Sequence, residues 1–201
     1  PEDAKRTQKV AARMVKAYAT QYPEEQFKVE SVEQEVEAPL MEGVAYRGFI
    51  DKLVTWDGEL TVMDHKTTSR IGPSTVKAFK PSLQFTGYVW LVQKVHQPHC
   101  KQVLVDVAWV GKTEPTSGQR FLRDIVMVEP WELEEFERLV AMVGTEIGVL
   151  LSLRSFDAFT PNWSACTLYG ECPYRTLCTA SPAAREILIE VYYQKKEEAC
   201  G

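Results

Sequence analysis

Two hydrophobic periodicities divide the chain into helices and strands. Spacings of three and four predict helices, and alternating or continuous apolar positions bounded by Gly, Pro, Asn or Asp predict strands. Proline and glycine residues between these segments mark where each predicted helix or strand ends. The predicted order is helix 4–21, strands 29–40, 44–56 and 59–68, helix 82–96, strands 101–112 and 120–130, helix 131–153, and a polar helix from 182.

This order of elements predicts an α/β fold in which helices flank a mixed central sheet. A chain of 201 residues is long enough for one sizeable core. We expect one domain over 1–201, with an N-terminal helix in 1–28, a central part in 29–130 and a helical, cysteine-rich part in 131–201.

Charged residues interrupt the apolar pattern of the predicted hairpin at 44–68. Its two-residue turn at Asp57-Gly58 pairs positions whose numbers add to about 115, which places Asp51 opposite Asp64. Lys66 shares the strand parity of Asp64, about 6–7 Å along the same face. Two facing carboxylates repel each other unless a cation lies between them. Oxygen ligands of this kind suit Mg²⁺ or Mn²⁺.

The alternative is that these are exposed hairpin charges, with Lys66 in a surface ion pair of little energetic value. Apolar neighbours on both faces of the hairpin favour partial burial instead. These neighbours are Phe49, Ile50, Leu53, Val62 and Met63.

Composition narrows the class of protein. The chain is 45% hydrophobic and 25% charged, as is usual for a soluble globular protein, and no apolar run reaches the roughly 18 residues of a membrane span. A net charge of −5 argues against a simple DNA-coating protein but allows a local basic track beside an acidic site. The candidates for such a track, each equally compatible with an ordinary surface position, are Lys77, Lys80, Lys94, Lys101, Lys112, Arg120 and Arg123. The charged, helical start is unlike a signal peptide, so we expect a cytoplasmic protein.

Three of the five cysteines lie close together, at Cys166, Cys172 and Cys178, with five residues between neighbours. Without a secretory signal, ligation of zinc or of an iron–sulfur cluster is more plausible than a disulfide framework.

The hairpin motifs resemble a known family. Residues 48–51 (GFID), 64–66 (DHK) and 84–88 (QFTGY) follow one another as in the RecB-type branch of the PD-(D/E)xK nuclease superfamily. The resemblance covers about 29–178 and implies a restriction-endonuclease-like core.

The resemblance also implies roles for these residues. Asp51, Asp64 and the His65 main-chain carbonyl would bind the catalytic Mg²⁺ or Mn²⁺, and Lys66 would position or deprotonate the attacking water. In the family an upstream glutamate often completes the site. Glu33 fits its spacing best, and Glu35 is the second candidate. The alternative is that both are solvated strand residues with no role in the site.

The helix 82–96 carries Gln84 and Tyr88 one turn apart, on one face. In the family these residues would orient the lysine and contact DNA, although Tyr88 is also compatible with a plain core position.

The segment 172–178 (CPYRTLC) is similar to the C-terminal part of iron–sulfur-containing RecB-type nucleases, which implies a [4Fe–4S] cluster on the three cysteines. We expect the fourth ligand upstream of Pro1, with Cys100 or Cys200 as poorer substitutes; zinc or free thiols are the alternatives. Arg175 beside the cluster is a candidate phosphate contact.

Two functions of different class follow. The first is a metal-dependent DNA exonuclease acting on single strands or duplex ends in recombination, repair or CRISPR adaptation, with a helicase, recombination or CRISPR protein as partner. The second is a non-catalytic DNA-binding scaffold that keeps the nuclease fold. The intact set of Asp51, Asp64 and Lys66 favours the enzyme, because a scaffold has no use for a buried acidic pair.

Overall fold

The computed structural model describes residues 7–72, 74–75, 77–96, 99–111, 118–153, 160, 162–168 and 170–193. The chain divides into two compact units, Pro1–Thr145 and Glu146–Gly201. The first unit contains the sheet and the hairpin residues, and the second contains the cysteine-rich segment.

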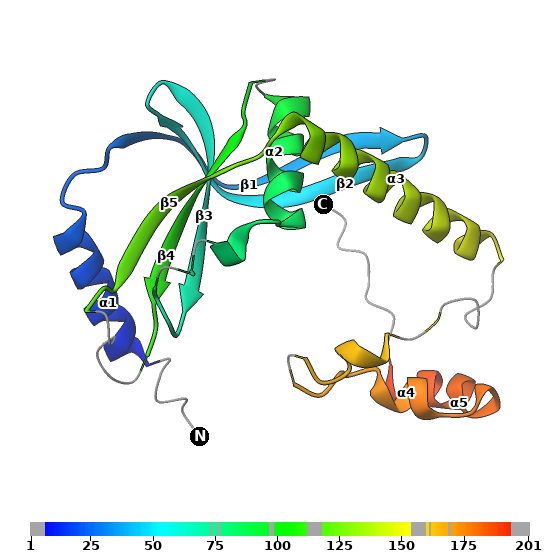
Figure 1. Cartoon of the computed structure of the whole chain (residues 1–201). Helices are drawn as coiled ribbons and strands as arrows, with labels where there is room; N and C mark the ends of the chain where they lie inside the picture. The colour runs from blue at the N-terminus through cyan, green and yellow to red at the C-terminus, as the bar shows by residue number, and fades with distance from the viewer. Residues whose placement is uncertain are drawn as a thin grey trace. The chain divides into compact units, whose positions relative to one another are not determined.

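The first unit is built on a five-stranded mixed sheet with the order β1-β2-β3-β4-β5 (Figure 1). Neighbouring strands are antiparallel except β3 and β4, which are parallel. A parallel pair needs a crossover connection, and the helix α2 provides it. The strands are β1 (Phe27–Met41), β2 (Val44–Trp56), β3 (Glu59–Thr68), β4 (Gln102–Trp109) and β5 (Phe121–Met127). The predicted α/β fold with a mixed, helix-flanked sheet is thus confirmed.

The helices begin where the sequence provides capping residues. Thr7 accepts a hydrogen bond from Val10 at the start of α1, and Ser82 accepts one from Phe85 at the start of α2, each side-chain oxygen satisfying a free N–H of the first turn. The helices are α1 (Gln8–Gln21), α2 (Leu83–Val95), α3 (Pro130–Ser152), α4 (Arg175–Thr179) and α5 (Pro182–Tyr192), with short 3₁₀ turns at Lys77–Phe79 and Trp163–Ala165.

Helices α1 and α2 lie on opposite faces of the sheet. Phe85 of α2 belongs to the same buried cluster as Val105 and Val107, whereas Tyr18 of α1 contacts Asp106 between them. Because neighbouring residues of a strand point to opposite faces, α2 and α1 cover different sides of β4. Asp64 and Lys66 share a parity on β3 and lie on the α2 face, and His65 lies on the α1 face.

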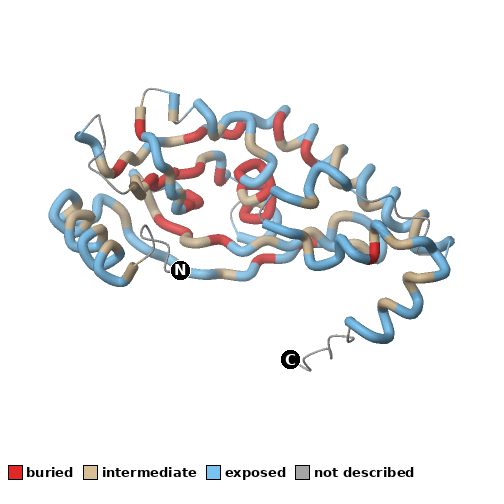
Figure 2. The backbone as a smooth tube through the Cα atoms, turned by 90° about the horizontal axis from the view of Figure 1, so that it is seen from below, coloured by how far each residue is buried: buried red, intermediate tan, exposed pale blue. Residues whose placement is uncertain are grey.

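Buried residues concentrate in the sheet and in α2 (Figure 2). The larger cluster lies between the sheet, α2 and the first half of α3, where Phe136 contacts Tyr46 and Trp90. A smaller cluster of Val54, Met63 and Leu104 lies on the other face. This core fixes α2 against β1, β2, β3 and β4, so the helix presents its first turn at a defined place beside β3.

The second unit is held by short local contacts. Among the described residues of this unit Leu177 is buried, the rings of Tyr174 and Tyr193 stack, and the Tyr193 hydroxyl donates to the Pro173 carbonyl at 2.7 Å. Contacts between α4 and α5 complete this unit.

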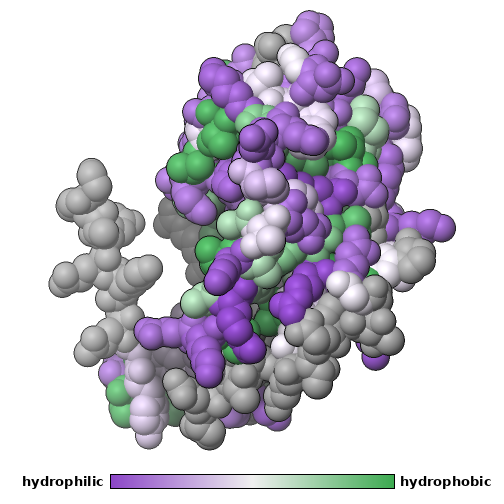
Figure 3. Space-filling model, turned by 90° about the vertical axis from the view of Figure 1, so that its left-hand side faces the viewer, coloured by the Kyte–Doolittle hydropathy of each residue, from purple (hydrophilic) through white to green (hydrophobic). Residues whose placement is uncertain are grey.

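Hydrophilic side chains intermix with smaller hydrophobic areas on the side of the molecule drawn in Figure 3. None of the helices in the described ranges is long and apolar enough to cross a membrane.

Candidate active site

The turn of the β2–β3 hairpin sets the register that the sequence predicts. Asp57 and Gly58 have φ values of 49° and 81°, which a type I′ turn requires at both central positions. The ladder runs from Trp56↔Glu59 to Lys52↔Met63, so paired numbers add to 115 as predicted. Pairing ends there, one position before Asp51 and Asp64.

Asp51 lies where the two strands separate. Its Oδ2 accepts a hydrogen bond of 2.8 Å from the main-chain N–H of His65. In an extended strand the N–H and C=O of one residue point to the same neighbour. The His65 carbonyl therefore also points to the β2 side, toward Asp51.

Asp64 is buried, with 1% of its surface exposed, and is not an exposed hairpin charge. Burial raises the pKa of its carboxyl above the ordinary value; Lys66 opposes this shift and Asp51 adds to it. The Lys66 ammonium lies 2.7 Å from Asp64 Oδ2. Within the described part of the chain this oxygen nevertheless receives no hydrogen bond of normal geometry. A buried oxygen with spare acceptor capacity fits a cation ligand.

Gln84 links the members of the site from the first turn of α2. Its Oε1 accepts a hydrogen bond of 2.9 Å from Lys66 Nζ, and its Nε2 lies 3.4 Å from Asp64 Oδ1. The same Nε2 donates to the Tyr88 hydroxyl at 2.9 Å. The structure thus brings together four predicted site residues, Asp64, Lys66, Gln84 and Tyr88, in one network. Tyr88 also packs against the large core cluster. Its hydroxyl thus contacts the site while its ring contacts the core, as the two interpretations of this residue predicted.

Gly48 explains how α2 comes so close to β2. A Cβ at this position would lie 2.8 Å from Leu91 Cδ1, closer than real Cβ atoms pack, and 3.2 Å from Tyr88 Cε1, which is also a tight contact. Leu91 is fully buried and has little room to move. The glycine of the GFID motif is therefore needed for the approach of the helix that carries Gln84.

The two candidate glutamates of β1 have different surroundings. Glu33 falls between the pairs Val32↔Lys52 and Gln34↔Ile50, at the level of Asp51, and its φ of 46° interrupts the ladder. Glu35 forms an ion pair with Arg47, with 2.9 Å between Glu35 Oε1 and Arg47 Nη1. Register favours Glu33 over Glu35 as the glutamate nearest the site, although both are exposed.

The oxygen donors fit a hard divalent cation. Two carboxylates, Asp51 and Asp64, and the His65 carbonyl converge where β2 and β3 separate. Mg²⁺ and Mn²⁺ take such oxygen ligands together with water. Over the ranges that the structure describes, no group of three or more His, Cys, Asp or Glu side chains forms a ready metal site.

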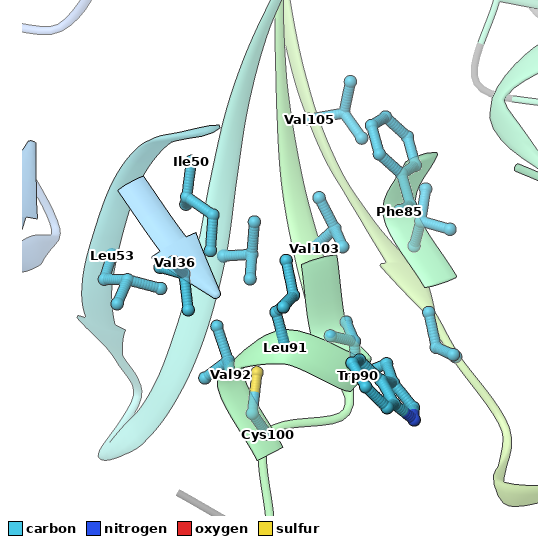
Figure 4. Packing of buried hydrophobic residues seen from close by; sticks show 14 of the residues in the cluster. Val36, Ile50, Leu53, Phe85, Trp90, Leu91, Val92, Cys100, Val103 and Val105 are labelled. Atoms are coloured by element: carbon cyan, nitrogen blue, oxygen red, sulfur yellow. The ribbon is translucent and has the colours of Figure 1, made fainter. Parts of the chain in front are cut away.

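The cysteines are divided between the two units. Cys166, Cys172 and Cys178 are free, partly buried thiols of the second unit, where Cys172 N–H donates to the Cys166 carbonyl at 3.0 Å. They do not form a preassembled ligand group. Cys100 is 1% exposed in the core of the first unit, beside Val92 (Figure 4). Cys200 lies outside the described residues.

Several basic residues expected along a DNA track are held by acidic partners. Arg123 is 10% exposed and pairs with Glu25 and Asp106. Lys80 and Lys94 form ion pairs with Glu132 and Glu137. Arg175 is exposed at the start of α4, 3.7 Å from Glu171. Lys112 lies outside the described residues.

Sequence reasoning missed Asp106. It lies in the apolar run VLVDVAW of β4 with its side chain 2% exposed, and it contacts His65 and Arg123. A single acid in the middle of a continuous apolar strand was the available signal, because such a residue is buried only with partners.

Comparison with known proteins assigns the family. The model of the PD-(D/E)XK nuclease superfamily matches residues 1–179. The chain therefore belongs to this superfamily, whose members are nucleases and generally use Mg²⁺ or Mn²⁺. No curated protein matches the chain.

A solved structure described as "Crystal structure of SSO0001" is similar to this chain, with a TM-score of 0.45 and 14% sequence identity. The similarity covers 85% of this chain and 68% of that one. A likeness this distant adds nothing to the assignment of the site.

Proposed function

We propose that this protein is a Mg²⁺- or Mn²⁺-dependent deoxyribonuclease, and specifically an exonuclease that hydrolyses single-stranded DNA or DNA ends during recombination, repair or CRISPR adaptation. One observation carries the proposal: Lys66 Nζ lies 2.7 Å from Asp64 Oδ2 and 2.9 Å from Gln84 Oε1, beside the carboxylate of Asp51.

Asp51, Asp64 and the His65 carbonyl would hold the metal ion, and Glu33 would complete the site. When bound, the ion would polarise the scissile phosphate and lower the pKa of its bound water. Lys66 would orient the attacking water and offset the negative charge that develops on the phosphate. Gln84 holds the ammonium of Lys66 in place, so the lysine needs little rearrangement when DNA binds.

The alternative is a DNA-binding scaffold. Burial raises the pKa of Asp64, so the fold is penalised for keeping this carboxylate ionised. Carboxyl groups whose pKa is shifted by burial concentrate at functional sites, and a scaffold would have no reason to keep such a group. The site therefore favours the enzyme.

The direct test is cleavage of end-labelled single-stranded and duplex DNA with Mg²⁺ or Mn²⁺. We expect the wild type to release nucleotides from an end and Lys66→Ala to be inactive. Lys28→Ala is the matched control, because Lys28 is an exposed lysine of β1 paired with Glu30. Cleavage that survives Lys66→Ala would refute this mechanism, and a folded wild type that binds DNA without cleaving it would favour the scaffold. Internal cuts in circular DNA would show an endonuclease.

We also propose that Cys166, Cys172 and Cys178 bind an iron–sulfur cluster of the [4Fe–4S] type. The support is three free, partly buried thiols within one small unit, two of them joined through a main-chain hydrogen bond. Thiolates are the usual ligands of such clusters. Anaerobic purification should yield a brown protein with visible absorption and bound iron and sulfide, and Cys172→Ser should be colourless. Bound zinc without iron would refute the cluster.

A further inference from the structure

The strand β3 carries two different sets of contacts on its two faces. Asp64 and Lys66 face α2 and form the candidate site, whereas the side chain of the residue between them, His65, points to the α1 face. The main chain of His65 nevertheless belongs to the site, because its N–H donates to Asp51 Oδ2 at 2.8 Å. His65 thus connects the two faces of the sheet.

On the α1 face, the side chain of His65 contacts the carboxylate of Asp106. In the parallel β3–β4 ladder His65 is the partner of Asp106, and its Nδ1 lies 3.1 Å from Asp106 Oδ2. Asp106 also contacts Arg123 Nε at 3.3 Å and the hydroxyl of Tyr18. Its carboxylate is 2% exposed, so nearly all of its interactions are with these protein groups.

Hydrogen-bond donors and a cation surround the Asp106 carboxylate. Tyr18 donates to Oδ2, Arg123 Nε lies 3.3 Å from Oδ1, and His65 Nδ1 lies against Oδ2. A carboxylate only accepts hydrogen bonds, so His65 Nδ1 must carry the hydrogen of this contact.

Arg123 is itself held firmly. Its two terminal nitrogens lie 2.7 and 3.0 Å from the oxygens of Glu25, in a bidentate pair. The guanidinium lies 3.8 Å from the ring centre of Tyr22, and it also contacts the Tyr18 hydroxyl. The acceptor of His65 is therefore fixed by α1, β5 and the segment between α1 and β1.

We propose that Asp106, acting through His65, is a positioning residue of the nuclease site: it fixes the main chain between Asp64 and Lys66 so that the His65 carbonyl and the Asp51 carboxylate face the same metal ion. This inference rests on the proposed function. Groups that orient metal ligands from outside typically affect metal affinity by about 10- to 100-fold when they are lost.

The test measures Mn²⁺ binding to the full chain by isothermal titration calorimetry, without DNA. His65→Leu removes the donor but leaves Asp106, Arg123 and Tyr18 in place, and Asp106→Asn removes the acceptor charge. We expect both variants to bind Mn²⁺ at least about 10-fold more weakly. His65→Asn places a side-chain N–H near the position of Nδ1 and should keep an affinity close to that of the wild type. Asp124→Asn, the same change on the exposed position next to Arg123, is the control.

A second readout separates positioning from general damage. In DNA cleavage, His65→Leu should raise the Mg²⁺ concentration needed for half-maximal rate while the KM for DNA stays unchanged. His65 is 39% exposed, so this variant is expected to fold even if Asp106→Asn does not, and thermal melting checks this.

The outcomes are distinct. A folded His65→Leu protein with wild-type Mn²⁺ affinity overturns the inference while the proposed function stands. Equal weakening by His65→Leu and His65→Asn also overturns it, because the hydrogen bond to Asp106 would then be irrelevant. A wild type that neither binds Mn²⁺ nor cleaves DNA overturns the proposed function, and this inference with it.

Discussion

Lys66 and Gln84 are joined by a hydrogen bond of 2.9 Å from Nζ to Oε1, which ties the lysine of β3 to the first turn of α2. The amide nitrogen of the same glutamine donates to Tyr88 and approaches Asp64. Because one amide contacts three members of the site, the position of α2 controls the position of the lysine.

Loss of the Gln84 amide should therefore slow the reaction more than it weakens binding. We expect Gln84→Leu to lower kcat by up to about 100-fold, as a small misplacement of a catalytic group does. Tyr88→Phe removes only the partner hydroxyl and should have a much smaller effect. Steady-state kinetics on end-labelled DNA check this. An equal loss of kcat in both variants would show that Gln84 acts through Tyr88 and not through its contact with Lys66.

Substitution of Gly48 should destabilise the first unit and impair the site together. A new Cβ would overlap Leu91 and press on Tyr88, so Gly48→Ala should cost about 1–3 kcal/mol in the free energy of unfolding. Gly144→Ala is the matched control, because a Cβ there meets only ordinary contacts at 3.4 and 3.5 Å in a helix. Urea titration measures both. Wild-type stability of Gly48→Ala would contradict the close approach of α2.

The two glutamates of β1 should differ in function. Glu33 lies at the level of Asp51, whereas Glu35 is paired with Arg47. We expect Glu33→Gln to raise the metal concentration needed for cleavage and Glu35→Gln to leave it unchanged. The measurement is the DNA cleavage rate as a function of Mg²⁺ concentration. The opposite order would assign the upstream glutamate to Glu35.

The Cys100 thiol should be inert in the folded protein. Burial raises the pKa of this thiol, and only the thiolate reacts with alkylating reagents. Iodoacetamide should therefore modify Cys166, Cys172 and Cys178 of metal-free protein, and should modify Cys100 only after unfolding, as peptide mass mapping would show. Rapid modification of native Cys100 would contradict its place in the core.

The same shift predicts a direction for stability against pH. The unfolded chain releases the Cys100 proton at the ordinary thiol pKa, whereas the folded chain holds it to higher pH. The contribution of Cys100 to stability is therefore complete below the ordinary pKa and falls as the pH rises above it. Cys100→Ala should reduce this alkaline loss in urea titrations at several pH values, and an unchanged loss would assign it to other groups.

Local patterns predicted the elements well, because the causes of these elements are local. The Asp57-Gly58 turn imposes positive φ values and sets the register of β2 and β3 without help from the rest of the chain. The Ser82 cap begins α2 for the same kind of reason. The register in turn placed Asp51 next to Asp64 before any tertiary contact was considered.

The network of Asp106 could not be predicted in this way. It joins α1, β3, β4 and β5, and its members are up to about a hundred positions apart, as the pair Tyr18 and Arg123 shows. The ion pairs of Arg123 with Glu25 and Asp106 could not be predicted for the same reason, because the partner of a charge depends on which distant acid the fold brings to it.

The sequence by itself determined the hairpin, its register, the order of the motifs and hence the nuclease superfamily, because turn geometry and strand alternation act between near neighbours. Only the tertiary structure decided that Asp64 is buried, that Gln84 holds Lys66, and that His65 is anchored to Asp106 on the opposite face. Burial and side-chain partners are properties of packed elements, and the packing of α2 and α1 on the two faces of the sheet sets both.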